Sequence, residues 1–117
     1  KDKVKYHAAA AIASNLVVGL IDLSEKLLME CGFERDEAGD ALAPIVWGNI
    51  KHILNNGVVE ALTGPIERGD ADTIKKHLAT ISGNDRETYI AVSRQVLEVA
   101  KRKNKDRDYS KIEEILK

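Results

Sequence analysis

The chain has 117 residues and a formal net charge of −1, from 18 basic and 19 acidic side chains. Its length suits one domain that buries roughly two thirds of its unfolded surface. The balanced charge argues against a nucleic-acid-binding surface, which would show as a basic excess. The single cysteine, Cys31, excludes an internal disulfide and fits the reducing cytoplasm, where we expect this protein to reside.

The N-terminal segment predicts one long helix. Helical spacing runs from Lys3 to Cys31, and Gly32 followed by Phe33 predicts a Schellman stop. The centre, Ala8 to Ile21, is apolar nearly all round but is shorter than the ~20 residues that span a bilayer. We therefore expect a buried helix and no membrane. Because such a helix must be covered on every side and one small domain has few helices to do so, we expect a homodimer through it.

Further helices are expected downstream. The second covers about 36–56 and ends at Gly57; it either begins near Asp40 or kinks at Pro44. A third covers 70–81, a fourth 84–103 with a capping box formed by Asn84 and Glu87, and a last short one begins at residue 110. No segment alternates with period two, so the predicted fold class is all-α, a helical bundle built around the long N-terminal helix. The predicted core faces are Leu42, Ile45, Val46, Ile50, Ile53 and Leu54; Ile74, Leu78 and Ile81; and Tyr89, Ser93, Val96, Leu97 and Ala100.

The segment from Ala61 to Asp70 predicts a rigid polar loop, punctuated by Gly64-Pro65 and Gly69 and closed by Asp70 as an N-cap. Its alternative interpretation is a plain connector between helices. The glycine spacing lacks the Lys-Ser/Thr of a phosphate-binding P-loop, which is therefore excluded. A rigid loop would hold three polar side chains as the wall of a binding site: Thr63, Glu67 and Arg68.

Polar residues on the long helix are candidates for a site. His7 and Ser14 share one stripe, with Asn15 adjacent to it. A buried asparagine amide needs partners, so Asn15 either bonds a neighbouring helix or faces a ligand. His7 suits acid–base catalysis near neutral pH, although no carboxylate or nucleophile stands at helical spacing to orient it.

Other reactive residues are given structural interpretations. The three histidines lie on different predicted helices without a second ligand at i+3 or i+4, so no metal site is expected. Cys31, at a helix C-terminus, is expected to be an inert packing residue. The basic run from Lys101 to Arg107 is expected to be a solvated helix end.

Three features together resemble one family: the string Tyr6 to Asn15 (YHAAAAIASN), Pro44 and Gly48 in the second helix, and the string Ala61 to Asp70 (ALTGPIERGD). The family is the C-terminal helical half of Rossmann-like predicted NADP-dependent oxidoreductases, and the resemblance runs from about Val4 to Ala100. It implies a preceding dinucleotide-binding domain that would bind NADP or NAD. It also implies a helical domain similar to that of 6-phosphogluconate dehydrogenase, which dimerises and closes the substrate cleft.

The resemblance implies that residues 1–117 are a single dimerisation and substrate-cleft domain with no redox activity or bound cofactor of its own. Its partners would be a second copy and its own Rossmann domain. The implied cleft residues are His7, Ser14, Asn15, Thr63, Gly64, Pro65 and Arg68. The chain opens with lysine directly in a helical pattern, as expected of a piece of a longer protein. The alternatives are a tag-cleaved complete chain and a free-standing helical interaction module with no enzymatic parent.

One position departs from the pattern of related enzymes. Hydroxyacid dehydrogenases similar to this family carry lysine as proton donor four residues before the asparagine, where this chain has Ala11 before Asn15. Alanine cannot donate a proton. If the longer protein reduces a carbonyl, another group must supply the proton, and His7 is the candidate on this helix. Whether the parent is an enzyme stays open.

Overall fold

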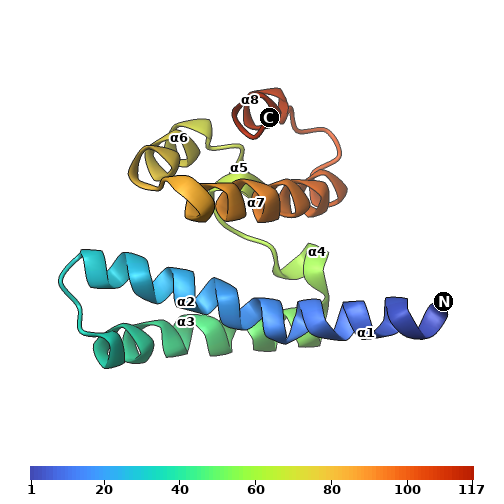
Figure 1. Cartoon of the computed structure of the whole chain (residues 1–117). Coiled ribbons are helices and arrows are strands. Elements are labelled where there is room, and N and C mark those ends of the chain that lie inside the picture. The colour runs from blue at the N-terminus through green and yellow to red at the C-terminus, as the bar shows by residue number, and fades with distance from the viewer. The chain divides into compact units, whose positions relative to one another are not determined.

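A computed structural model describes all residues, 1–117, and confirms the all-α fold class (Figure 1). Helices hold 81% of the residues and there are no strands. The helices in chain order are α1 (Asp2–Ala13), α2 (Asn15–Glu30), α3 (Arg35–Asn56), α4 (Val58–Ala61), α5 (Pro65–Arg68), α6 (Ala71–Thr80), α7 (Gly83–Lys103) and α8 (Ser110–Ile115). The chain divides into two units, Lys1–Trp47 and Gly48–Lys117, with the boundary inside α3. The expectation of a single domain stays a prediction.

The first unit is a helical hairpin of α1–α2 and the start of α3 (Figure 1). The expected single N-terminal helix is interrupted at Ser14, whose backbone leaves helical geometry and whose Oγ donates to the Ala10 carbonyl oxygen over 2.6 Å. A serine that bonds the carbonyl four residues earlier competes with the helical ladder and bends it. The helix ends as predicted, because the Gly32 and Phe33 N–H groups donate to the Met29 and Leu28 carbonyls in the Schellman pattern.

Helix α3 begins before Asp40, the residue near which one of the two sequence-based alternatives placed its start. It starts at Arg35 and continues through Pro44 to Asn56, so a start near Asp40 is wrong. The Glu37 carboxylate accepts from the Glu34 N–H over 2.8 Å at this N-terminus, which satisfies a backbone donor that the helix leaves free. The predicted stripe on α3 is partly correct, since Leu42, Val46, Ile50 and Ile53 are half-buried whereas Ile45 and Leu54 are exposed.

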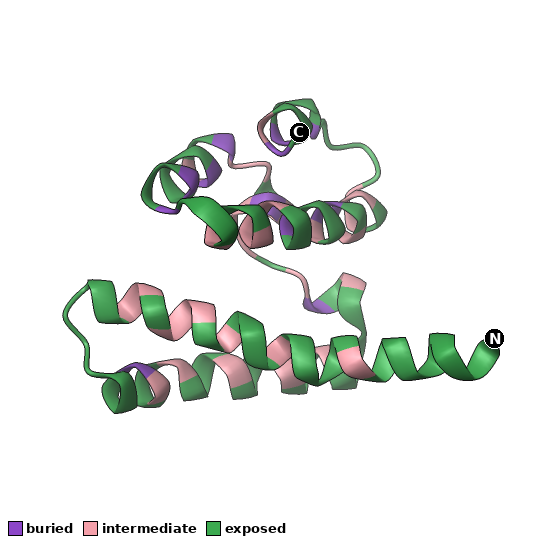
Figure 2. Ribbon diagram, in the orientation of Figure 1, coloured by how far each residue is buried: buried purple, intermediate pink, exposed green.

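The first unit buries little apolar surface. Ala38 is its only buried residue (Figure 2). The large apolar side chains of α1 and α2 are open to solvent, including Tyr6 at 79% and Val18 at 69% exposure, and Trp47 on α3 is 74% exposed. By length and hydropathy alone, Asp2–Glu30 meets the criteria for a membrane-crossing helix. None of its most apolar stretch is buried, so the expectation of a buried helix is wrong within this chain.

The second unit contains the core of the chain. Helix α7 contacts α4 and α5, and α6 contacts α5 and α8 (Figure 1). Ile74, Leu78 and Ile81 are buried, as are Ser93, Leu97 and Ala100, which confirms those predicted faces. Tyr89 and Val96 pack against the core from half-buried positions. The core cluster consists of Ile66, Ala71, Ile74, Leu78, Leu97, Ala100, Tyr109, Ile112 and Leu116.

The predicted capping box at the start of α7 is wrong. The helix begins at Gly83, with Ser82 as N-cap and no side-chain hydrogen bond to the cap. Asn84 is therefore already inside the first turn, where its carbonyl oxygen accepts from the Thr88 hydroxyl over 2.9 Å. The last helix, α8, begins at Ser110 as predicted.

Candidate functional site

The predicted loop between Ala61 and Asp70 contains one helical turn, α5. Pro65 occupies its first position, where a missing N–H costs nothing, and Gly69 ends it at φ 70°. That left-handed conformation favours glycine. Asp70 caps α6 as predicted, accepting from the Thr73 N–H over 3.1 Å and from its hydroxyl over 2.7 Å. The hydrogen bonds from Thr73 hold the pKa of Asp70 below its ordinary value.

A polar clamp formed by Glu67, Asn104, Arg107 and Tyr109 holds this turn to the chain after α7. The Glu67 carboxylate accepts from Asn104 Nδ2 and from an Arg107 guanidinium nitrogen, each over 2.9 Å. The Glu67 carbonyl oxygen accepts from the Tyr109 hydroxyl and from Arg107, each over 2.6 Å. The Asn104 amide and then Arg107 lower the pKa of Glu67, against the opposing effect of burial. The Glu67 carboxylate therefore has a structural role, because both of its hydrogen bonds hold α5 to the chain after α7.

The basic run after α7 is not simply a solvated helix end. Lys103 Nζ donates to the Leu62 carbonyl oxygen over 2.7 Å and to the Glu60 carbonyl oxygen over 3.1 Å, at the end of α4. Arg107 belongs to the polar clamp. These two cations satisfy carbonyl groups that short helical turns leave without partners, so the earlier interpretation is wrong for Lys103 and Arg107. Together they fix α4 and α5 on α7.

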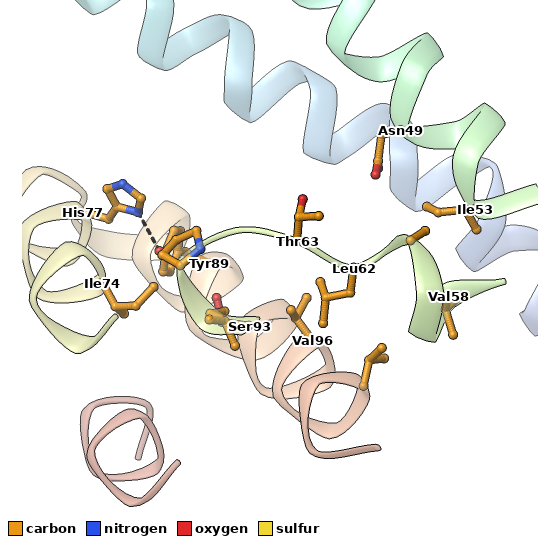
Figure 3. Close-up of a pocket in the computed structure, with 14 residues that line it drawn as sticks. Asn49, Ile53, Val58, Leu62, Thr63, Ile74, His77, Tyr89, Ser93 and Val96 are labelled. Carbon is orange, nitrogen blue, oxygen red and sulfur yellow. Dashed lines mark hydrogen bonds between the residues drawn. The ribbon is translucent and has the colours of Figure 1, made fainter. Parts of the chain in front are cut away.

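A cavity of about 530 Å³ opens between α7 and the segment that these contacts fix (Figure 3). It lies within the second unit. Its walls are mainly aliphatic, and no Asp, Glu, Lys or Arg lines it. Its size falls in the range of small-molecule sites, which are typically apolar with a few convergent polar groups. The lining residues are Asn49, Ile53, Val58, Ala61, Leu62, Thr63, Pro65, Ile66, Ile74, His77, Tyr89, Ser93, Val96 and Val99.

The polar end of the cavity is formed by His77, Tyr89 and Ser93 (Figure 3). His77 Nδ1 and the Tyr89 hydroxyl are hydrogen-bonded at 2.8 Å, and the two rings meet edge to face with centroids 5.8 Å apart. Burial raises the pKa of the Tyr89 phenol, so this hydroxyl stays protonated at neutral pH. Ser93 follows Tyr89 by one helical turn and is 6% exposed.

The sequence-predicted site residues divide between the two units. Thr63 and Pro65 line the cavity, and Gly64 lies between them. Arg68 is exposed on α5, where its guanidinium lies 4.0 Å from the Asp70 carboxylate. His7, Ser14 and Asn15 are exposed in the first unit. Ser14 bonds its own helix, and Asn15 makes no side-chain hydrogen bond to another helix of this chain.

Two further features bear on the sequence interpretations. Cys31 is exposed, so its assignment as a packing residue is wrong. No group of three or more His, Cys, Asp or Glu side chains gathers in a geometry that could hold a metal ion.

The sequence predicts Thr63 and Pro65 as cleft residues, but it does not bring His77, Tyr89 and Ser93 together with them. Tyr89 and Ser93 were placed correctly on one face of a helix, but as core residues. His77 was considered only as a metal ligand. The available signal was the polar character of two side chains at i, i+4 on an otherwise apolar face, since buried hydroxyls require partners.

The first 96 residues of the chain match a family described as a domain of unknown function, DUF2520. The chain belongs to the DUF2520 family. The match covers all of the first unit and both resemblance strings, and it includes His77, Tyr89 and Ser93 of the cavity. No curated protein and no solved structure matches this DUF2520 chain.

Proposed function

We propose that this DUF2520 chain is the dimerisation and substrate-cleft domain of a Rossmann-type NAD(P)-dependent oxidoreductase-like protein of the cytoplasm. The observation that carries the proposal is the uncovered apolar surface of α1 and α2, where Val4, Ile12, Leu16 and Val18 are 58–73% exposed. A large apolar surface that is left open to solvent marks an interaction site. A second copy supplies the same surface, and a two-fold arrangement makes one patch self-complementary.

The resemblance supports the second part of the proposal. It assigns dinucleotide binding to a preceding domain, so residues 1–117 alone carry no redox activity. The cleft residues that the resemblance implies are His7, Ser14, Asn15, Thr63, Gly64, Pro65 and Arg68. Thr63 and Pro65 line a cavity that is accessible to a small molecule, which agrees with a position at a cleft. Ala11 removes the expected lysine, so any proton donor is another group.

The test of dimerisation is sedimentation equilibrium of the 117-residue chain at micromolar concentration. We expect a dimer that Val18→Glu and Ile12→Glu convert to monomer, because each places a charge in the apolar contact. Val92→Glu is the matched control: Val92 is an exposed apolar residue of the second unit, on α7, and its replacement leaves the dimer intact. A stable, well-folded monomer of the unaltered chain would contradict the proposal and favour an interaction module. Co-flotation with lipid vesicles would instead assign the surface to a membrane.

The test of the oxidoreductase relationship uses the longer protein. A coding sequence upstream of Lys1 should contain a strand followed by G-x-G-x-x-G, within about 130–170 residues by analogy with a Rossmann domain. NADPH should bind the longer protein and not residues 1–117. Tight NADPH binding by the 117-residue chain alone would contradict the division of roles.

A further inference from the structure

The cavity of the second unit contains a polar group with no partner inside the protein. Ser93 is only 6% exposed, yet its hydroxyl makes no hydrogen bond within the chain. No fully buried side-chain oxygen or nitrogen lacks a partner. The Ser93 oxygen must therefore be reachable from the cavity that this residue lines, and Figure 3 shows it on the same side of α7 as Tyr89.

The hydrogen-bonded pair of His77 and Tyr89 supplies a second hydrogen-bond donor in the same cavity. In the His77–Tyr89 pair, Nδ1 either donates to the phenol oxygen or accepts from the hydroxyl. In the first case the Tyr89 hydrogen is left for a ligand, and in the second the Nε2–H of His77 is left. The pair therefore keeps one donor in either tautomer. His77, Tyr89 and Ser93 line the same cavity, so a carbonyl oxygen that enters it can accept from the pair and from Ser93.

The remaining walls restrict the charge of the ligand. Ile53, Val58, Leu62 and Val96 are apolar, and no Asp, Glu, Lys or Arg side chain lines the cavity. A carboxylate or an ammonium group would lose its hydration there without gaining an opposite charge, which is unfavourable. An uncharged ligand avoids this cost.

We propose that the second unit binds a small neutral amphipathic molecule, whose aliphatic body contacts the wall of Ile53, Leu62 and Val96 and whose carbonyl or amide oxygen accepts from Tyr89 or His77 and from Ser93. This site goes beyond the proposed function. It shares the cavity with Thr63 and Pro65, but its ligand chemistry is argued from His77, Tyr89 and Ser93, which the proposed function does not use.

The test is a titration of the full 117-residue chain with three probes of equal chain length: octanamide, octanoate and octylammonium. Binding is followed by nuclear magnetic resonance shifts of backbone amides. We expect octanamide to bind more tightly than either ion and to shift amides near Tyr89, Ser93 and Leu62. Equal binding of all three probes, no binding of octanamide, or shifts confined to α1 and α2 would each overturn the proposal.

Variants make the test specific. Tyr89→Phe and Ser93→Ala each remove one hydroxyl and should weaken octanamide about 3- to 10-fold, as expected for one hydrogen bond. Tyr6→Phe is the matched control, because it removes the same hydroxyl from an exposed residue outside the cavity. Unchanged affinity in both cavity variants, with circular dichroism showing an intact fold, would overturn the proposal. Sedimentation of the same samples reports the dimer separately, so failure of one proposal is distinguishable from failure of the other.

Discussion

At the scale of single residues, Glu67 shows how a side chain can be polar, central to a loop and still structural. Its side chain is 17% exposed, and both its carboxylate and its carbonyl oxygen accept hydrogen bonds. These bonds come from residues more than 35 positions later in the chain. Nothing local in the sequence around Glu67 announces those partners, which is why it was grouped with Thr63 and Arg68 as a binding-site wall.

Replacing Glu67 with glutamine should make stability less dependent on pH. The pKa of Glu67 is lowered in the folded chain, so its contribution is fully present above its ordinary value of 4.5 and is lost as pH falls through the lower folded value. At neutral pH we expect Glu67→Gln to cost about 1–2 kcal/mol, the worth of charge-assisted hydrogen bonds. Urea unfolding at pH 7 and pH 3 checks this.

The control for that experiment is Glu60→Gln. Glu60 is exposed on α4, and its carboxylate makes no hydrogen bond or ion pair. Its replacement should leave both unfolding midpoints unchanged. If Glu67→Gln loses as much stability at pH 3 as at pH 7, the carboxylate charge does not stabilise the clamp.

At the scale of elements, local sequence signals predicted the ends of helices correctly where a single residue determines the end. The stop at Gly32 and the Asp70 cap were predicted correctly, because each depends on a bond within a few residues. The break at Ser14 was not predicted, and the course of α3 through Pro44 was one of two alternatives that the sequence left open. Both depend on a balance between a local disruption and the packing of the whole helix, and the sequence does not give that balance.

Helix α3 tolerates Pro44 at a cost. Proline in a helix interior removes one N–H donor and crowds the carbonyl four residues earlier, here that of Asp40, and this costs up to about 3 kcal/mol. Pro44 is exposed, so its ring contributes little packing in this chain. Pro44→Ala should therefore raise the thermal unfolding midpoint without changing the helical content much. A lower midpoint would show that the ring has a packing role that outweighs the missing bond.

At the scale of the whole molecule, the two units differ in how much apolar surface they bury. Of the buried apolar residues, only Ala38 belongs to the first unit. The composition predicted aliphatic helices, which are present, whereas the expected burial of the N-terminal helix is not found within this chain. It did not predict the division, because binary patterning shows which face of a helix is apolar but not which element covers it.

This difference predicts separate behaviour of the two units. A fragment of residues 48–117 should fold alone, with a cooperative unfolding transition, since it contains the entire core cluster. A fragment of residues 1–47 should not form a stable monomer, because a helical hairpin with one buried residue gains little from packing. Circular dichroism melts of both fragments check this. A cooperative, monomeric melt of the 1–47 fragment would show that the hairpin needs no partner.

The indole of Trp47 gives the chain a built-in optical sensor. It is the sole tryptophan, it is three-quarters open to water, and it stands at the last position of the hairpin unit. Indole fluorescence moves to shorter wavelength when water leaves the ring. A partner or ligand that covers Trp47 can therefore be detected by fluorescence in unlabelled protein, without adding a dye or altering any residue.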